Sequence, residues 1–249
     1  MKKSALSFLL LIVITFSNAH SQSVYVKIGG GYGRSLAEQN IINSAFWPLW
    51  QYNFGSYGRG YNLQAGLGYN INQNFAVELA GSYTKGVTFE ITRSVNDTKY
   101  RLYANTIFIM PSAIVKAPIK DITPYARVGM AAGIITKYTE STPYPMTGSV
   151  SEGPYDYKEH GGLALGIQFA GGISFKAAKK LDIYAEVFGI GLTYSPKTLE
   201  NTKNQSGSLQ PTITYSESGI TGDNNTARTP SYPFSSIGMN VGITYTFGK

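Results

Sequence analysis

The chain contains no cysteine and only two histidines, and these shortages remove several classes of chemistry. Without cysteine there can be no disulfide, thiolate metal site, cysteine nucleophile or lipid-modified N-terminal cysteine. His20 falls in the predicted leader described below, which leaves His160 alone in the mature chain. A Ser-His-acid triad or a histidine-based metal centre would need partners that no sequence pattern supplies. We therefore expect no catalytic residue, no metal site, no cofactor and no enzyme activity.

Charged residues are scarce as well. They make up 14% of the chain, against about a quarter in ordinary soluble domains. A soluble β protein of this length would need more charge to solvate its exterior. The formal net charge of +7 falls by two if Lys2 and Lys3 are removed with a leader, and the basic residues are scattered rather than clustered. This distribution argues against a nucleic-acid partner.

No apolar run is long enough to be a transmembrane helix. The run near the start, Leu6 to Phe16, is shorter than the roughly 20 residues that span a bilayer. Basic residues precede it and small, polar residues follow it, as in a secretory signal peptide. We predict a cleaved signal peptide over residues 1–21, with the cut ahead of Gln22; a cut after Ala19 is the alternative. Residues 22–249 then form one domain outside the cytoplasm.

The chain is instead rich in glycine and tyrosine, arranged in alternating patterns. The last segment, Ser236 to Lys249, places apolar or aromatic residues at every second position. Successive side chains of a β-strand point to opposite faces, so this segment is predicted to be a two-faced strand. Its apolar residues are Ile237, Met239, Val241, Ile243, Tyr245 and Phe247, and its other phase is small or polar.

Seven earlier segments show the same alternation, which gives eight predicted strands. The first seven are 24–33, 59–71, 75–91, 99–117, 123–138, 160–177 and 181–194. Their connections are alternately long and short, with long segments at 34–57, 139–158 and 195–232. Alternation of this kind places the short turns at one end of a cylinder and the long loops at the other. Pro111 obscures the phase of the fourth strand, since proline in a strand favours a bulge or a break in pairing.

The orientation of the two faces decides between a soluble and a membrane barrel. Gly, Ala, Ser and Thr dominate the polar phase, which suits the narrow lumen of an eight-stranded barrel. The strands reach the roughly 9 to 11 residues that cross a membrane. Aromatic residues gather near the short-turn ends, as an interfacial girdle would: Tyr69, Phe75, Phe175, Tyr245 and Phe247. We predict a transmembrane eight-stranded antiparallel up-and-down β-barrel, all-β, with short periplasmic turns and long extracellular loops.

The leader, the eight strands, the alternating loops and the ending Ile-Thr-Tyr-Thr-Phe together resemble the small outer-membrane barrels of the outer-membrane-protein-A and porin-like "outer membrane protein β-barrel domain" type. The resemblance implies residence in the cell outer membrane and contact with outer-membrane lipid. It also implies handling by periplasmic chaperones and by the barrel-assembly machinery, with Tyr245 and Phe247 as the assembly signal. In the family an aromatic residue is commonly last, whereas Gly248 and Lys249 follow Phe247 here.

Four charged residues fall in the inward phase of alternate strands: Lys27, Glu78, Arg127 and Glu186. If the barrel closes, they meet at similar height near the short-turn end. Unpaired buried charges are costly, so we expect an ion-pair network that fills the lumen, as the resemblance also implies. The alternative is that trapped water solvates them separately.

One predicted loop carries an apolar cluster where polar residues are usual. Phe46, Trp47, Leu49 and Trp50 lie within it. An exposed apolar patch can mark a partner site, so we treat them as a possible loop contact patch. The alternative is an aromatic belt at the outer membrane interface or packing over the barrel mouth.

These features favour a structural or surface-interaction role through the extracellular loops, with a ligand that the sequence does not identify. The alternative function is a small, mostly closed pore for water or small solutes, gated by the charge network, because an eight-stranded barrel leaves little open lumen.

Overall fold

The computed structural model describes residues 23–36, 39–43, 52–55, 57–93, 98–142, 155–204, 213–216 and 226–247. The predicted signal peptide lies outside these residues, so its presence and its cleavage site stay predictions. In the described part of the chain, no helix is long and apolar enough to cross a membrane.

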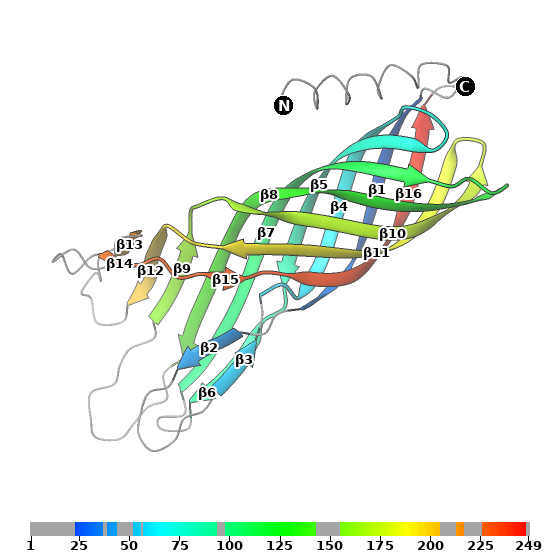
Figure 1. Cartoon of the computed structure of the whole chain (residues 1–249). Coiled ribbons are helices and arrows are strands. Elements are labelled where there is room, and N and C mark those ends of the chain that lie inside the picture. Colours follow the sequence, from blue (N-terminus) through cyan, green and yellow to red (C-terminus); the bar gives the residue numbers. More distant parts are fainter. Residues whose placement is uncertain are drawn as a thin grey trace, which may run out of the picture.

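Within the described residues, eight long strands form a closed antiparallel barrel (Figure 1). Each strand pairs with the next one along the chain, and the last pairs with the first. The predicted fold class is confirmed. The strands are β1 (Ser23–Ser35), β4 (Gly60–Asn70), β5 (Phe75–Gly86), β7 (Thr98–Lys116), β8 (Ile122–Thr142), β10 (Ala164–Ala178), β11 (Leu181–Tyr194) and β16 (Ser236–Phe247).

The terminal strand β16 closes the barrel. It pairs with β1 in unbroken register from Val24↔Phe247 to Ser35↔Ser236, and on its other side with β11. A sheet edge inside a bilayer would leave backbone N–H and C=O groups without partners, which closure avoids. The alternating pattern of β16 therefore sits at the seam on which the whole barrel depends.

Short turns join the strands at one end of the barrel, at the right in Figure 1. They comprise residues 71–74, 117–121 and 179–180. In the first turn the Asn72 side-chain Oδ1 accepts hydrogen bonds from the backbone N–H groups of Asn74 and Phe75, both at 2.8 Å. An asparagine that replaces backbone partners in this way specifies a tight turn.

The long connections at the other end contain strands of their own. β6 (Phe89–Arg93) and β9 (Tyr155–His160) pair with the outer ends of β7 and β8, and β12 (Thr198–Asn204) pairs with β9. This sheet extension, at the left in Figure 1, continues through β13 (Ile213–Ser216) and β14 (Thr226–Arg228). The remaining short strands are β2 (Gln39–Asn43), β3 (Tyr52–Gly55) and β15 (Tyr232–Pro233).

The extension corrects two expectations. Residues 139–158 and much of 195–232 were expected to be loops, and His160 to begin the sixth barrel strand. Instead β8 runs on to Thr142, and His160 ends β9. These segments lack apolar alternation because no lipid or core requires it outside the membrane, and they become strands by pairing with the long β7–β8 hairpin.

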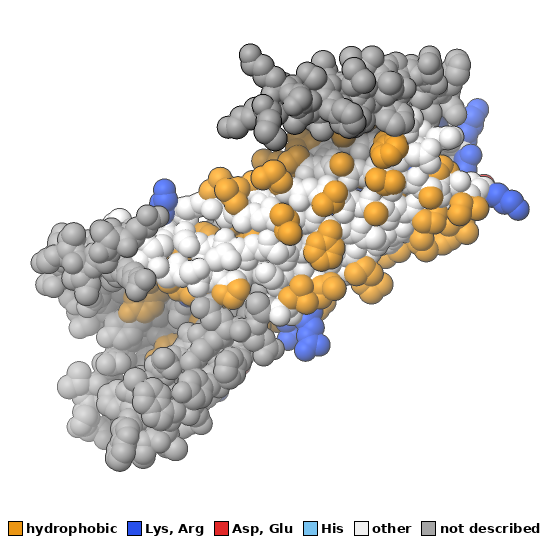
Figure 2. Space-filling model, viewed as in Figure 1, with side chains coloured by type: hydrophobic (Ala, Val, Ile, Leu, Met, Phe, Trp, Pro, Cys, Tyr) orange, Lys and Arg blue, Asp and Glu red, His pale blue; other side chains and the backbone are white. Residues whose placement is uncertain are grey.

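Along the barrel wall the apolar phase points outward. Val128 is 63% exposed whereas Ala131, in the opposite phase of the same strand, is 0% exposed. Figure 2 shows hydrophobic side chains distributed along the wall, with Lys and Arg side chains at its ends. A surface of this kind is poorly solvated by water and matches the hydrocarbon core of a bilayer.

Proline in β7 does not change the phase of that strand. Met110, Ser112 and Ile114 are buried and point inward, so Pro111 lies on the outward side. The pairing of β7 with β8 is interrupted between Ile109↔Ala132 and Ser112↔Gly129 but resumes in the same register. The expected break in pairing is therefore present, and there is no bulge in that pairing.

We predict that Val128→Arg destabilises the barrel in lipid vesicles by about 2–4 kcal/mol, because it places a charge halfway along the lipid-facing wall. Ile122→Arg is the matched control on the same strand. It lies at the short-turn end, where the expected cost is about 0–1 kcal/mol. Urea unfolding in vesicles measures both, and equal costs would show that the apolar wall does not face lipid.

Candidate functional site

The structure brings the four inward charged residues together in the lumen. Lys27 lies on β1, Glu78 on β5, Arg127 on β8 and Glu186 on β11, and all four are buried. Alternation directs each side chain inward from its strand, and the closed sheet brings the four strands around one narrow space. We call these four residues the inner network.

Glu186 is the centre of the inner network, and its carboxylate accepts five hydrogen bonds. Its Oε2 accepts from Lys27 Nζ and Tyr125 OH, both at 2.8 Å. Its Oε1 accepts from Arg127 Nη2 at 2.9 Å, Gln64 Nε2 at 3.0 Å and Asn240 Nδ2 at 3.1 Å. A fully buried carboxylate is tolerated only when charge and hydrogen bonds replace its hydration. Here both replacements are present.

Arg127 links the two carboxylates of the inner network. Its Nη1 donates to Glu78 Oε1 at 2.8 Å, while its Nη2 donates to Glu186. Tyr25 OH donates to the other oxygen of Glu78 at 2.9 Å. Two cations and two carboxylates therefore balance within a space from which water is largely excluded, and charge-assisted hydrogen bonds of this kind are among the stronger ones.

The two halves of the barrel contribute to the inner network through the same arrangement of residues. On β1, β4 and β5 the register aligns Tyr25 with Gly68 and Gly68 with Glu78, so that the tyrosine reaches across the glycine to the carboxylate. On β8, β10 and β11 the register aligns Tyr125, Gly172 and Glu186 in the same way. A cation lies two residues after each tyrosine, Lys27 and Arg127, and a glutamine lies four residues before each glycine, Gln64 and Gln168.

The two halves exchange their charge partners. Lys27 of the first half binds Glu186 of the second, while Arg127 of the second half binds both Glu78 and Glu186. Gln168 donates to Ser112, and Gln64 donates to Glu186 and to Tyr184 OH. The internal repeat was missed from the sequence. Its signal is the recurrence of Tyr-x-(Lys/Arg), of Gln four residues before Gly, and of Glu-x-x-Gly in the same order.

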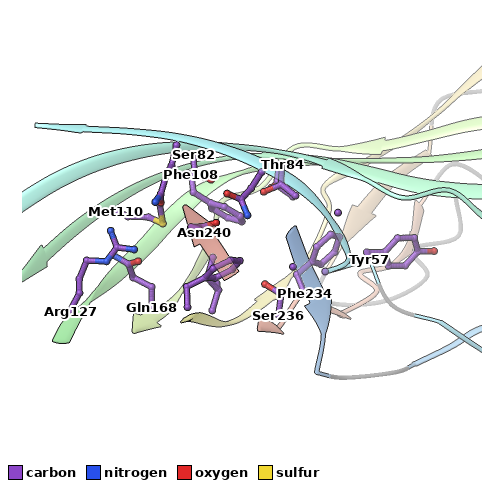
Figure 3. A pocket seen from close by; sticks show the side chains of 18 residues that line it. Tyr57, Ser82, Thr84, Phe108, Met110, Arg127, Gln168, Phe234, Ser236 and Asn240 are labelled. Carbon is purple, nitrogen blue, oxygen red and sulfur yellow. The ribbon is translucent and has the colours of Figure 1, made fainter. Parts of the chain in front are cut away.

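Cavities lie on both sides of the inner network. On the short-turn side a cavity of about 250 Å³ is lined by Lys27, Glu78 and Lys116 among others. On the long-loop side a cavity of about 40 Å³ extends from Arg127 and Gln168 past Phe108 and Asn240 to Phe234 and Tyr57 (Figure 3). The side chains of the network separate the two.

A second ion pair is buried in the lumen farther towards the long loops. Lys137 on β8 donates to Glu159 on β9, its cross-strand neighbour, and Tyr232 OH donates to Glu159 at 2.9 Å. The Lys137 ammonium lies over the rings of Tyr57 and Tyr232, 5.1 and 4.1 Å from their centroids. We call Lys137 and Glu159 the outer pair. The sequence did not reveal it, because Glu159 lies on a strand that was expected to be a loop.

Aromatic side chains pack around the outer pair. The ring of Tyr57 stacks on Phe234 at 5.5 Å between centroids. Burial raises the pKa of the Tyr57 hydroxyl, and the nearby Glu159 carboxylate raises it further. The tyrosine is therefore neutral at physiological pH, so it adds no negative charge beside the Glu159 carboxylate.

His160 lies on the sheet extension beside a carboxylate. Its Nε2 is 3.3 Å from Glu200 Oε2, and both side chains are partly exposed, at 35% and 47%. Among the described residues, no group of three or more histidine, aspartate or glutamate side chains could hold a metal ion.

The roles of two other predicted sites stay predictions. Phe46, Trp47, Leu49 and Trp50 lie outside the described residues, so their contact role stays a prediction. Tyr245 and Phe247 are exposed at the short-turn end of β16, with their rings edge to face at 4.9 Å. Their role as an assembly signal also stays a prediction.

The comparisons with known proteins agree with this geometry. A family model, "Outer membrane protein beta-barrel domain", matches residues 6–206, which is well over half of the chain. The chain belongs to this family. Members of the outer membrane protein beta-barrel domain family reside in the outer membrane, and we assign this chain to the same location. No curated protein matches the sequence.

The chain is similar to solved structures of outer-membrane proteins, at low sequence identity. A major outer membrane protein from Thermus thermophilus aligns with a TM-score of 0.52 at 10% identity, covering 92% of this chain and 100% of that one. Neisserial surface protein A has a TM-score of 0.42 at 13% identity, over 91% and 97% of the two chains. The Escherichia coli outer membrane protease OmpT has a TM-score of 0.39 at 9% identity, over 93% and 100%. The first of these supports the fold.

We predict that Gly68→Ala loosens the inner network. A Cβ at Gly68 would lie 2.0 Å from the Tyr25 ring, so the tyrosine must move away from Glu78, at a cost of about 1–3 kcal/mol for overpacking. Gly171→Ala is the matched control, because its Cβ would meet nothing within 4 Å. Urea unfolding compares the two variants, and a stability change no larger for Gly68→Ala would contradict the packing argument.

We also predict that Glu186→Gln lowers the free energy of unfolding by about 3–5 kcal/mol, because it leaves Lys27 and Arg127 buried with one carboxylate between them. The control is Glu90→Gln, since Glu90 forms an exposed pair with Arg101 at 2.9 Å. Exposed pairs contribute about 0–1 kcal/mol. Similar losses in both variants would mean that water solvates the lumen charges.

Proposed function

We propose that this protein is a non-enzymatic outer-membrane barrel with a closed lumen, which acts as a structural scaffold that presents its long-loop end to the cell exterior. The observation that carries the proposal is that buried, paired charges lie in the lumen at two heights, in the inner network and in the outer pair. We infer that both layers block the passage.

The energetics support a closed state. An ion or solute that passes the inner network has to displace Arg127 or Lys27 from Glu186, and a buried charge separated from its partner costs about 3–5 kcal/mol. The same argument applies to the outer pair, where Lys137 would also leave the faces of two tyrosines. Two such barriers in series disfavour steady conduction.

The sheet extension supports a surface role. Binding commonly resides on segments that a rigid scaffold holds in place, and β7 and β8 continue from the barrel wall into the extension. On it the rings of Tyr103 and Tyr138 stack at 4.8 Å, and Tyr103 OH donates to Glu140 at 3.0 Å. This aromatic pair beside a carboxylate is a candidate contact for an extracellular ligand.

The second candidate function is a small pore, and one observation favours it. Cavities of about 40 and 250 Å³ already lie on the two sides of the inner network. A rearrangement of Arg127 would join them and leave only the outer pair to close the passage.

An enzymatic role has less support. The carboxylates Glu78 and Glu186 are bound by cations and tyrosines, and His160 pairs with Glu200 at the surface. OmpT is a protease by name, but a TM-score of 0.39 at 9% identity carries no argument about this chain.

Planar-bilayer conductance tests the closed lumen against the pore. We expect the wild-type protein to be silent, because both closures are intact. Glu78→Lys disrupts the inner network and Glu159→Gln the outer pair, so the double variant is expected to conduct more than either single variant. Glu90→Lys is the control for added charge outside the lumen. Steady ion-sized openings in the wild type would favour the pore, and silence of a folded double variant would show that these layers do not close the passage.

A further inference from the structure

Three basic side chains form a cluster on the outside of the barrel at its long-loop end. Arg34 lies near the end of β1, Arg59 immediately precedes β4, and Lys85 lies near the end of β5. All three are exposed and belong to the outward phase of their strands. They come from three adjacent strands, so they occupy one patch of the wall, which we call the rim cluster.

The strand register places the two arginines opposite each other. Tyr32 is paired with Tyr61 across β1 and β4, and two residues further out the same register brings Arg34 beside Arg59. Lys85 is paired with Tyr61, which puts it diagonally next to Arg59. Diagonal neighbours on one face of a sheet remain within reach of long side chains.

This arrangement is unfavourable for the isolated protein. Like charges directly opposite each other on a sheet destabilise it, and in the described part of the chain no carboxylate forms a salt bridge with any of the three. Arg59 Nε donates to the hydroxyl of Tyr32, which carries no charge to offset that of the arginine. By contrast, Arg101 on the neighbouring extension has its own partner, Glu90. Among the residues that the structure describes, the rim cluster therefore lacks the counter-charge that Arg101 has.

The position of the rim cluster on the barrel wall shows which part of the membrane it faces. Two residues towards the membrane on the same face are the aromatic side chains of Tyr32 and Tyr61, packed edge to face at 5.0 Å. Tyr61 is 67% exposed, and below it Leu63 belongs to the lipid-facing wall. Aromatic side chains mark the interface between hydrocarbon and head groups, so the rim cluster lies at head-group height.

We propose that Arg34, Arg59 and Lys85 bind the phosphate groups of a lipid in the outer leaflet of the outer membrane. Guanidinium groups bind phosphate through paired, charge-assisted hydrogen bonds. A bound phosphate would lie between the two arginines and cancel their repulsion, while the acyl chains of the same lipid would lie along the apolar wall below Tyr61. The proposal depends on the orientation of the barrel and not on whether its lumen is closed.

The test measures binding of diphosphorylated lipid A, and of the same lipid without its phosphates, to protein reconstituted in phosphatidylcholine. The test variant is the double substitution Arg34→Gln and Arg59→Gln. The matched control is Lys179→Gln and Lys180→Gln, which removes two exposed charges at the short-turn end. We expect the test variant to bind diphosphorylated lipid A at least about tenfold more weakly, because the charge-assisted hydrogen bonds of both guanidinium groups to phosphate are lost. The control variant is expected to bind like the wild type.

Thermal unfolding in two bilayers separates lipid binding from a merely structural role. In phosphatidylcholine alone, the test variant should unfold at the same temperature as the wild type or a higher one, because repulsion is removed. With lipid A present, the wild type should become the more stable of the two. Lys85→Gln provides a milder variant if the double substitution does not fold.

Three results would overturn the proposal. The first is that wild type and test variant bind diphosphorylated lipid A equally well. The second is that the wild type binds the dephosphorylated lipid as tightly as the diphosphorylated one. The third is that inorganic phosphate displaces lipid A at an equal concentration. The last would mark a site for free phosphate instead.

Discussion

The whole structure depends on satisfying backbone hydrogen bonds where no water is present. A sheet inside a bilayer has no partner for an edge strand, so the chain must bring its first and last strands together. β16 does this through an unbroken register with β1 and a second ladder with β11. Once the sheet is closed, alternation leaves no freedom in the placement of side chains. Every second residue faces lipid, and the others share a lumen that eight strands make narrow.

The narrow lumen explains the pairing of glycine with tyrosine. An inward tyrosine needs space on the neighbouring strand, and Gly68 and Gly172 provide it opposite Tyr25 and Tyr125. Each tyrosine then reaches a carboxylate on the strand beyond. The rings also replace water around the charges, so that Glu186 and Glu78 are solvated by protein donors. The contacts that stabilise the buried charges therefore also fill the lumen, so a passage for ions or solutes would have to break them.

Much of this could be predicted from the sequence, because the membrane imposes a simple rule. Period-two alternation in β16 and its counterparts predicts the strands, their facing and the inward position of Lys27, Glu78, Arg127 and Glu186. The rest depends on tertiary register, which alternation does not encode. The five donors to Glu186, the outer pair and the sheet extension arise from pairings between distant segments. The extension is the least predictable part, since strands such as β9 lie beyond the lipid-facing wall and need no apolar pattern.

The exchange of charge partners between the two halves has a consequence for how the barrel forms. The carboxylate of Glu186 draws its donors from β1, β4, β8 and β16, which include both ends of the chain. Lys27 and Glu78 of the first half find their charge partners only in the second half, and a sheet that lacks its last strand has an incomplete shell around Glu186. Groups that act as one hydrogen-bonded unit gain their stability together. The inner network is therefore complete only when the first and last strands are both in place, and its stability favours the fully closed barrel over one that lacks a strand.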